Sequence, residues 1–168
     1  MMLKIIVSIV ACLMFACASS DTSGEKPRVK VKTVSATKFE LRFIAEVNKV
    51  RAMPRTCGNK KFSAAAALAL NAKLTLASYK HSLDMFENQF LEHVSSNGDT
   101  LVERLRDVNY DWSAVAENLA HNQKSIQQVI EDWLSSPGHC SNVMSSDYTQ
   151  AGVAVVNGYW TQVYAAPK

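Results

Sequence analysis

The chain has 168 residues, of which 48% are hydrophobic and 20% are charged, and its formal net charge is +3. This length favours one domain with a hydrophobic core and excludes a disordered polyelectrolyte. Four Cys and six Gly exclude a disulfide-dense miniprotein and a collagen-like chain. Three surplus cations are weak evidence for nucleic acid binding, which usually requires Lys and Arg clustered on one face, so we expect no nucleic acid partner.

Residues 1–18 have the pattern of a secretory signal peptide. Lys4 precedes an apolar run from Ile5 to Ala16 that is too short to cross a membrane. No later segment is long and apolar enough for a span, so we expect a soluble mature protein. It would be secreted, periplasmic or anchored to the bacterial envelope by lipid.

Two processing routes remain open for this segment. Ala16-Cys17-Ala18 matches ordinary signal cleavage after Ala18. Met14-Phe15-Ala16-Cys17 resembles a lipobox, which would leave a lipidated Cys17 and make that lipid the route to the membrane. Ile9-Val10-Ala11-Cys12 fits a lipobox better by residue type but leaves a shorter apolar core.

Residues 19–37 read as a flexible basic linker. The cations Lys26, Arg28, Lys30 and Lys32 alternate with other residues, Val29 and Val31 among them. We favour a solvated linker. The alternative is a tether on anionic lipid, to which each cation would add about 1 kcal/mol.

The next segments alternate helical patterns with breaks. Apolar residues at helical spacing predict a helix over 37–52, which Pro54 and Gly58 interrupt. Residues 64–90 predict one helix or two, with Asn71 as a possible start. Residues 101–107 predict a short helix after a loop at Gly98.

The C-terminal third predicts a helix followed by a β-hairpin. Ser125 and Gln128 match a capping box ahead of an apolar helical run that Pro137-Gly138 should end. Two β-rich runs, 152–156 and 159–164, flank Asn157-Gly158, which is a strong hairpin pattern. Residues 115–119 are a candidate third strand, and helices must cover the faces of such a small sheet.

Cys57 and Cys140 remain after export. An oxidising compartment favours pairing them in a disulfide. The alternative is a nucleophilic Cys140 activated by His139, but adjacent side chains diverge, which leaves His139 badly placed for that role.

Six ordered segments carry a family resemblance. They are Arg55-Thr56-Cys57-Gly58, His81-Ser82-Leu83-Asp84-Met85, Glu117-Asn118-Leu119-Ala120, the run Trp133-Leu134-Ser135-Ser136-Pro137-Gly138-His139-Cys140-Ser141-Asn142-Val143-Met144, Gly152-Val153-Ala154 and Trp160-Thr161-Gln162-Val163-Tyr164. Together they resemble the bacterial branch of the CAP superfamily, which comprises cysteine-rich secretory proteins, antigen 5 and pathogenesis-related proteins. The resemblance implies an SCP-like domain over 38–168 with an α+β fold, an α-β-α sandwich whose small antiparallel sheet lies between helical layers. It also implies a disulfide between Cys57 and Cys140.

The resemblance further implies a cleft lined by two His and two Glu. Carried over by position, the first His is His93, the first Glu is Glu117, and the second His is His139. The second Glu is replaced by Ser136, and the Gly that often precedes Glu-Asn is Ala116. His81 is a further candidate for the cleft wall, and Asn118 is expected to brace the loop beside Glu117.

These residue types permit divalent metal binding, with zinc as the first candidate. His93, His139 and Glu117 could supply three protein ligands, the usual number in a catalytic zinc site. No carboxylate would then remain to activate water, because Ser136 stands where the second Glu would be. Hydrogen bonding among these groups, without metal, is the simplest interpretation.

Other chemistry is not indicated. The chain has no His-Glu-x-x-His, Gly-x-Ser-x-Gly or phosphate-binding Gly-rich motif. We expect His121 to be a solvated loop residue and Trp112, Trp133 and Trp160 to lie on packing faces.

The sequence therefore favours an exported, non-enzymatic protein whose cleft binds a small ligand, lipid, metal or envelope protein. A metal-dependent hydrolase or peptidase is one alternative, and an envelope scaffold with an incidental cleft is another.

Overall fold

A computed structural model describes residues 37–168. The predicted signal peptide, both processing sites with Cys12 and Cys17, and linker residues 19–36 lie outside the described residues. The elements, in chain order, are α1 (Lys38–Arg51), β1 (Arg55–Cys57), β2 (Lys60–Phe62), β3 (Ala69–Leu70), α2 (Ala72–Asn88), α3 (Leu101–Asp107), β4 (Trp112–His121), α4 (Ile126–Ser135), α5 (Pro137–Met144), β5 (Gln150–Val156) and β6 (Tyr159–Pro167).

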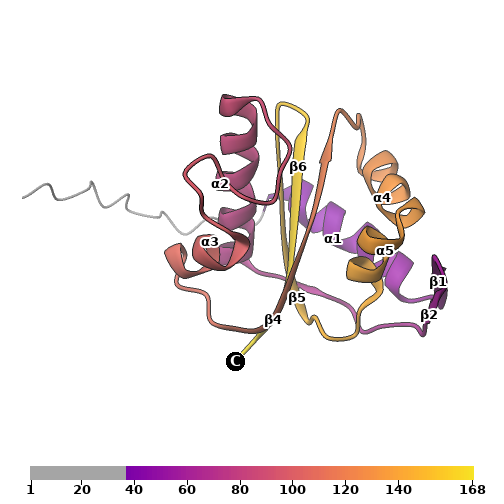
Figure 1. Ribbon diagram of the computed structural model, residues 1–168. Coiled ribbons are helices and arrows are strands. Elements are labelled where there is room, and N and C mark those ends of the chain that lie inside the picture. Colours follow the sequence, from indigo (N-terminus) through magenta and orange to yellow (C-terminus); the bar gives the residue numbers. More distant parts are fainter. Residues whose placement is uncertain (1–36) are drawn as a thin grey trace, which may run out of the picture. The chain divides into compact units, whose positions relative to one another are not determined.

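The elements form three layers, with the sheet in the middle (Figure 1). The main sheet has the order β3-β5-β6-β4, in which β3 is parallel to β5 and the other pairs are antiparallel. Helices α2 and α3 cover one face, and α1, α4 and α5 cover the other. This is the α-β-α arrangement that the resemblance implies.

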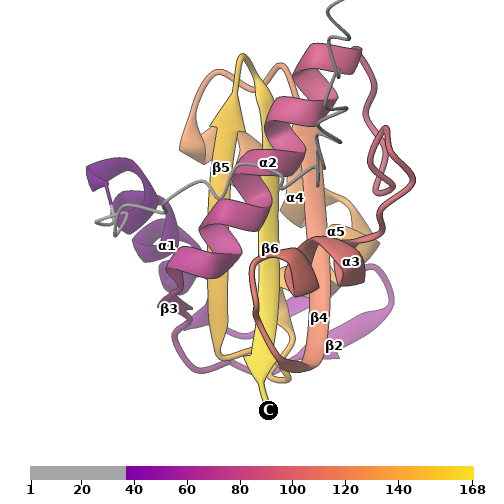
Figure 2. The same cartoon turned by 90° about the vertical axis from the view of Figure 1, so that its left-hand side faces the viewer.

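The predicted hairpin is confirmed as β5 and β6. Asn157 and Gly158 both have positive φ, 46° and 87°, as a two-residue turn of the type favoured between twisted strands requires. Gly152 in β5 has a further role, because a Cβ there would lie 2.1 Å from the backbone of Leu74. Its lack of a side chain allows α2 to pack directly against the sheet (Figure 2).

Helix α2 begins later than the start of the Ala-rich segment. Asn71 caps it by accepting hydrogen bonds from the backbone N–H groups of Lys73 and Leu74, 2.9 and 3.3 Å away, which confirms Asn71 as a start. A helix over residues 64–70 is wrong. There, tertiary hydrogen bonds override the helix propensity of alanine: the Asn48 side chain holds both backbone groups of Leu68.

Pro137 begins a helix rather than only ending one. Helix α4 stops at Ser135, as predicted, and α5 follows at once with Pro137 at its first position. Proline suits this position because the missing N–H would be unpaired there anyway. Pro137-Gly138 predicts only the end of a helix, so α5 is an element that the sequence pattern does not reveal. The cap at Ser125 is present: its side chain accepts from the Gln128 N–H.

The core on the α1 side is built around aromatic rings. Trp133 and Trp160 are 1% and 5% exposed, and the Phe43 ring lies 6.0 and 6.1 Å from theirs. Both tryptophans thus lie on packing faces, as predicted. Trp112 is only half-buried, with the Arg106 guanidinium 5.8 Å from its ring.

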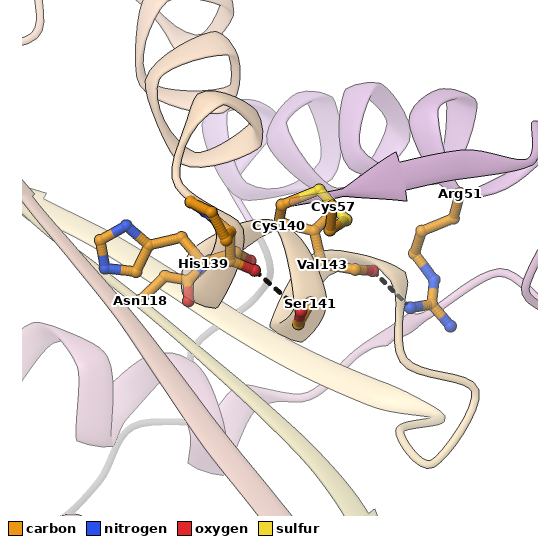
Figure 3. The surroundings of a disulfide bond; sticks show 8 residues. Arg51, Cys57, Asn118, His139, Cys140, Ser141 and Val143 are labelled. Atoms are coloured by element: carbon orange, nitrogen blue, oxygen red, sulfur yellow. Dashed lines mark hydrogen bonds between the residues drawn. A yellow bond between two sulfur atoms is a disulfide. The ribbon is translucent and has the colours of Figure 1, made fainter. Parts of the chain in front are cut away.

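A disulfide joins Cys57 in β1 to Cys140 in α5 across 83 residues of sequence. Figure 3 shows the Cys140 side chain directed toward Cys57 while the His139 ring points the other way, beside Asn118. The pairing agrees with the prediction, and the divergence leaves His139 away from the sulfur. In the loop-entropy description, such a ring stabilises the fold by about 4.5 kcal/mol.

Arg51 closes the same end of the molecule from inside. Its side chain is fully buried and donates to the carbonyl oxygens of Ala66, Val143 and Ser145 at 2.6–3.0 Å. The bond to Val143 is drawn in Figure 3. Arg51 therefore ties α1 to the loop before β3 and to the end of α5.

The outer edge of β4 is covered by side chains. The Asn142 amide donates to the Glu117 carbonyl at 3.3 Å, and the Trp133 indole donates to the Leu119 carbonyl at 2.9 Å. Without such partners, the unpaired carbonyls of an edge strand can pair with another chain and promote aggregation.

Within residues 37–168, no helix is both long and apolar enough to cross a membrane.

Candidate functional site

Glu117 is the centre of a buried ionic cluster on the α2 face of β4. Its side chain is 3% exposed, and its two oxygens face different cationic partners. The His93 Nδ1 lies 2.9 Å from Oε1, and the Arg104 Nη2 donates to Oε2 at 2.7 Å. Charged hydrogen bonds of this length are stronger than neutral ones, so both carboxylate oxygens are firmly engaged.

Arg104 comes from α3 and holds the preceding loop in place. Its Nη1 donates to the carbonyls of His93 and Asp99 and to the Ser95 hydroxyl, at 2.9–3.1 Å. The loop 89–100 passes beside β4 on its way to α3 (Figure 2). The Arg104 side chain is only 6% exposed, so the segment that carries His93 is fixed to Glu117 through one buried guanidinium.

His93 and His81 both lie close to the Glu117 carboxylate, but their pKa values are shifted in opposite directions. The hydrogen bond to Glu117 raises the pKa of His93, whose side chain is 60% exposed. His81 in α2 is fully buried with its Nε2 4.0 Å from Oε1 of Glu117, and desolvation lowers its pKa. His81 Nε2 donates to the Glu92 carbonyl at 2.9 Å, and Nδ1 is 3.2 Å from the Ser95 hydroxyl. This is the pattern of a neutral imidazole with its proton on Nε2.

Asn118, the next residue in β4, serves the opposite face. Its amide donates to the His139 carbonyl at 3.1 Å and to the Tyr164 hydroxyl at 3.2 Å, and its oxygen accepts from Asn142 at 2.9 Å. The Tyr164 hydroxyl in turn donates to Gln162 at 2.7 Å. Burial raises the pKa of Tyr164 well above its usual value, so this network is neutral throughout.

His139 links the two faces electrostatically. It lies in α5 and is half-buried, and burial followed by the nearby charge of His93 lowers its pKa. The pKa shifts of the two histidines thus run in opposite directions, so His139 loses its proton at a lower pH than His93. His139 is anchored to Asn118 by its backbone rather than by its ring.

The structure brings the sequence-predicted residues together to different degrees. His93 and Glu117 are in contact, His81 lies against the same carboxylate, and Asn118 braces the backbone of His139. Ser136 precedes α5 as its cap residue without a side-chain capping bond.

The structure corrects the expectation for His121 and adds Arg104 to the site. His121 ends β4, is half-buried and stacks on Tyr159 with ring centroids 3.8 Å apart, so it is not a solvated loop residue. Arg104 is a central member of the cluster that the sequence analysis missed. Arg104 lies in the short helix α3. No local pattern in the sequence distinguishes it there from an exposed arginine.

The arrangement does not provide a prepared metal site. Among residues 37–168, no three His, Cys, Asp or Glu side chains are grouped so that they could hold a metal ion. Both Glu117 oxygens already bind basic side chains, so a metal ion would compete with His93 and Arg104 for this carboxylate. His93, Glu117 and His139 as a zinc-binding set therefore stay a prediction from the sequence.

Sequence comparison relates the chain to two proteins of Bacillus subtilis. It is 39% identical over 84 residues to the uncharacterized membrane protein YlbC, covering 50% of this chain and 24% of that protein. It is 24% identical over 151 residues to the uncharacterized protein YkwD, covering 89% of this chain and 58% of that protein. The chain thus spans less than two thirds of the length of either relative.

Solved structures share the fold. An extracellular protein of Bacillus anthracis that contains an SCP domain matches with a TM-score of 0.67 and 25% identity, covering 75% of this chain and 39% of that one. An outer surface protein of Borrelia burgdorferi matches with a TM-score of 0.65 and 18% identity, covering 80% and 97%. The model of the cysteine-rich secretory protein family, CAP, matches residues 44–164. The chain belongs to the cysteine-rich secretory protein (CAP) family.

Proposed function

We propose that this protein is exported to the bacterial envelope or exterior and binds a ligand or partner at the Glu117 cluster without catalysing a reaction. The observation that carries the proposal is the engagement of both Glu117 oxygens by His93 and Arg104. A general base needs a free carboxylate within reach of water or substrate, and a metal ligand needs a free lone pair. Glu117 is 3% exposed and each of its oxygens already accepts a hydrogen bond from a basic side chain, so it is poorly placed for either role.

Export is supported by two independent features. Disulfides form and persist in oxidising compartments, and this chain joins Cys57 to Cys140. The B. anthracis protein with the same domain is extracellular, and the B. burgdorferi protein with the same fold is an outer surface protein. Whether the chain is cleaved after Ala18 or lipidated at Cys17 is decided by the mass of its mature N-terminus.

A zinc titration followed by calorimetry separates this proposal from a metal-dependent hydrolase. We expect no micromolar binding that depends on the cluster. His121→Ala is the matched control, because His121 is also half-buried but stacks on Tyr159 away from Glu117. Micromolar zinc binding that His93→Ala and His139→Ala abolish, and that His121→Ala keeps, would contradict the proposal and favour the hydrolase.

Native mass spectrometry separates ligand binding from an inert scaffold. A ligand held at the cluster should copurify with the wild-type chain and be lost from His93→Ala, because His93 is the exposed member of the cluster. A scaffold with an incidental cluster predicts that partner capture is unchanged in His93→Ala and is lost only after substitutions elsewhere on the surface.

An apolar groove between α1 and α2 supports a second candidate, the binding of a lipid or another apolar ligand. It has a volume of about 500 Å³ and is lined mainly by apolar side chains, Phe39, Leu76, Tyr79 and Val155 among them. This volume suits a small-molecule site. Binding of a fluorescent fatty acid by the wild type but not by Leu76→Arg would support this candidate. His93→Ala is the control, because it leaves the groove intact.

A further inference from the structure

Three cations on the β1–β2 ribbon have no acidic partner. Arg55 lies in β1, Lys60 and Lys61 lie in β2, and all three are exposed. Within the part of the chain that the structure describes, none of them takes part in an ion pair with an Asp or Glu. Lys60 has its ammonium 4.7 Å from the Phe62 ring, a contact that does not neutralise its charge. We call these three residues the basic ribbon.

The basic ribbon is held in a fixed position. The strands β1 and β2, which carry these three residues, pair Arg55 with Phe62 and Cys57 with Lys60. Cys57 is also bonded to Cys140 of α5. The turn is also fitted closely, because a Cβ at Gly58 would lie 3.0 Å from Pro137. In Figure 1 the ribbon lies at the end of the molecule beyond α5, on the opposite side of the sheet from α2.

The surroundings do not neutralise this charge. No Asp or Glu occurs between Glu46 and Asp84 in the sequence, and Glu46 is paired with Lys49 at 2.8 Å. Helix α5, against which the ribbon packs, carries no acidic residue. Asp147, in the loop that follows α5, is the acidic residue nearest to α5 in the sequence. The ribbon is therefore a local excess of positive charge in a chain of modest net charge.

An exposed apolar side chain adjoins these cations. Met53 lies between α1 and β1 and is 65% exposed, more than any other large hydrophobic residue in the described chain. Pro54 joins it directly to Arg55. Cations beside an apolar side chain suit a membrane surface, where headgroups attract the charges and the apolar group enters the boundary with the acyl chains. A soluble polyanion would give Met53 nothing to contact.

We propose that the basic ribbon and Met53 form a docking site for the anionic headgroups of a lipid bilayer. The site lies on the opposite side of the sheet from the Glu117 cluster, so docking leaves that cluster accessible. The proposal does not depend on a lipid at Cys17, and it does not require the cluster to bind a ligand.

Vesicle flotation tests the docking site. The exported chain would carry Cys17→Ser in every sample, so that no lipid can be attached there. Its partitioning to vesicles of equal parts phosphatidylcholine and phosphatidylglycerol is compared with that to phosphatidylcholine alone. Each cation near an anionic surface is worth about 1 kcal/mol, so Lys60→Ala with Lys61→Ala should weaken binding to the anionic vesicles about 30-fold. Met53→Ser should weaken it roughly tenfold.

The control variant removes the same charge elsewhere. Lys80 in α2 and Lys124 before α4 are exposed lysines outside the ribbon, and Lys80→Ala with Lys124→Ala should leave binding near the wild-type value. Equal loss in the control and ribbon variants would overturn the proposal, because it would report net charge alone. Binding to soluble polyphosphate that needs Lys60 and Lys61, combined with no effect of Met53→Ser on vesicles, would overturn it in favour of an anionic polymer.

Discussion

Glu117 and Asn118 are neighbours in β4, yet their side chains lie on opposite faces of the sheet and meet different kinds of partner. On the α2 face, Glu117 is held by the charged groups of His93 and Arg104. On the α5 face, Asn118 is held by the neutral groups of Tyr164 and Asn142 and by a backbone carbonyl. One alternation of the strand thus separates an ionic cluster from a neutral network.

The difference determines what each face can do. The ionic face carries a buried anion between two cations, so its free energy depends on pH and on the presence of every partner. The neutral face has groups that do not titrate near pH 7, and it fixes the backbone of His139. We infer that the stability of the ionic face depends on pH, while the neutral face keeps the edge of the sheet in position.

The largest expected effect comes from removing the charge of Glu117. Glu117→Gln leaves the buried Arg104 without a counterion, and breaking a buried pair in this way destabilises a fold by about 3–5 kcal/mol. Urea unfolding measures the loss. The double variant Glu117→Leu with Arg104→Met removes both charges and should be much less destabilised than Glu117→Gln. A loss below about 1 kcal/mol for Glu117→Gln would show that the pair is not buried as described.

A smaller effect is expected on the neutral face. Asn118→Ala removes three hydrogen bonds but leaves no buried charge, so we expect a loss of about 1–3 kcal/mol in the free energy of unfolding. The loss should be the same at pH 5.5 and pH 8, because no group of the network titrates in that range. A pH-dependent loss would mean that Asn118 acts through His93 or His139 and would remove the contrast between the faces.

The smallest effect concerns the pH dependence that His93 contributes. Because the folded state raises its pKa, the stabilisation from His93 is fully present below the ordinary value of about 6.5 and is lost as pH rises through the raised value. The His93 side chain is largely exposed, so solvent screening limits the contribution to less than about 1 kcal/mol.

The measurement is the difference between wild type and His93→Ala in urea unfolding at several pH values. The difference should be largest in mildly acid solution and decline toward alkaline pH. His81 and His139, whose pKa values are lowered, act in the opposite sense, and comparing the two chains cancels the contribution of His81. A difference that grows with pH would contradict the assignment.

Local patterns in the sequence were sufficient to predict elements whose turn or cap residues are distinctive. Asn157-Gly158 predicted the hairpin because the turn needs residues that tolerate positive φ. Asn71 marked the start of α2 because its side chain caps that helix. The resemblance placed Glu117 and His93 at one site, although they are far apart in the sequence.

The rest depended on contacts that no local pattern contains. Residues 64–70 are Ala-rich, but Asn48 and Arg51 from α1 bind the backbone of this segment, which does not form a helix. Arg51 and Arg104 are both buried. Arg51 donates hydrogen bonds to backbone carbonyl oxygens, and Arg104 donates to the Glu117 carboxylate. Buried arginines are rare, and their partners here come from distant segments, so neither could be distinguished from a surface cation by sequence.

The central claim is that Glu117 raises the pKa of His93 on one side of β4, while burial lowers the pKa of His139 around the edge of that strand. The chain has four histidines, so an NMR titration of their ring protons, assigned with His93→Ala and His139→Ala, tests this directly. We predict that the pKa of His93 lies above the ordinary histidine value and that of His139 below it. A His93 pKa at or below that value would contradict the account, since the carboxylate would then not be bound to His93 in solution.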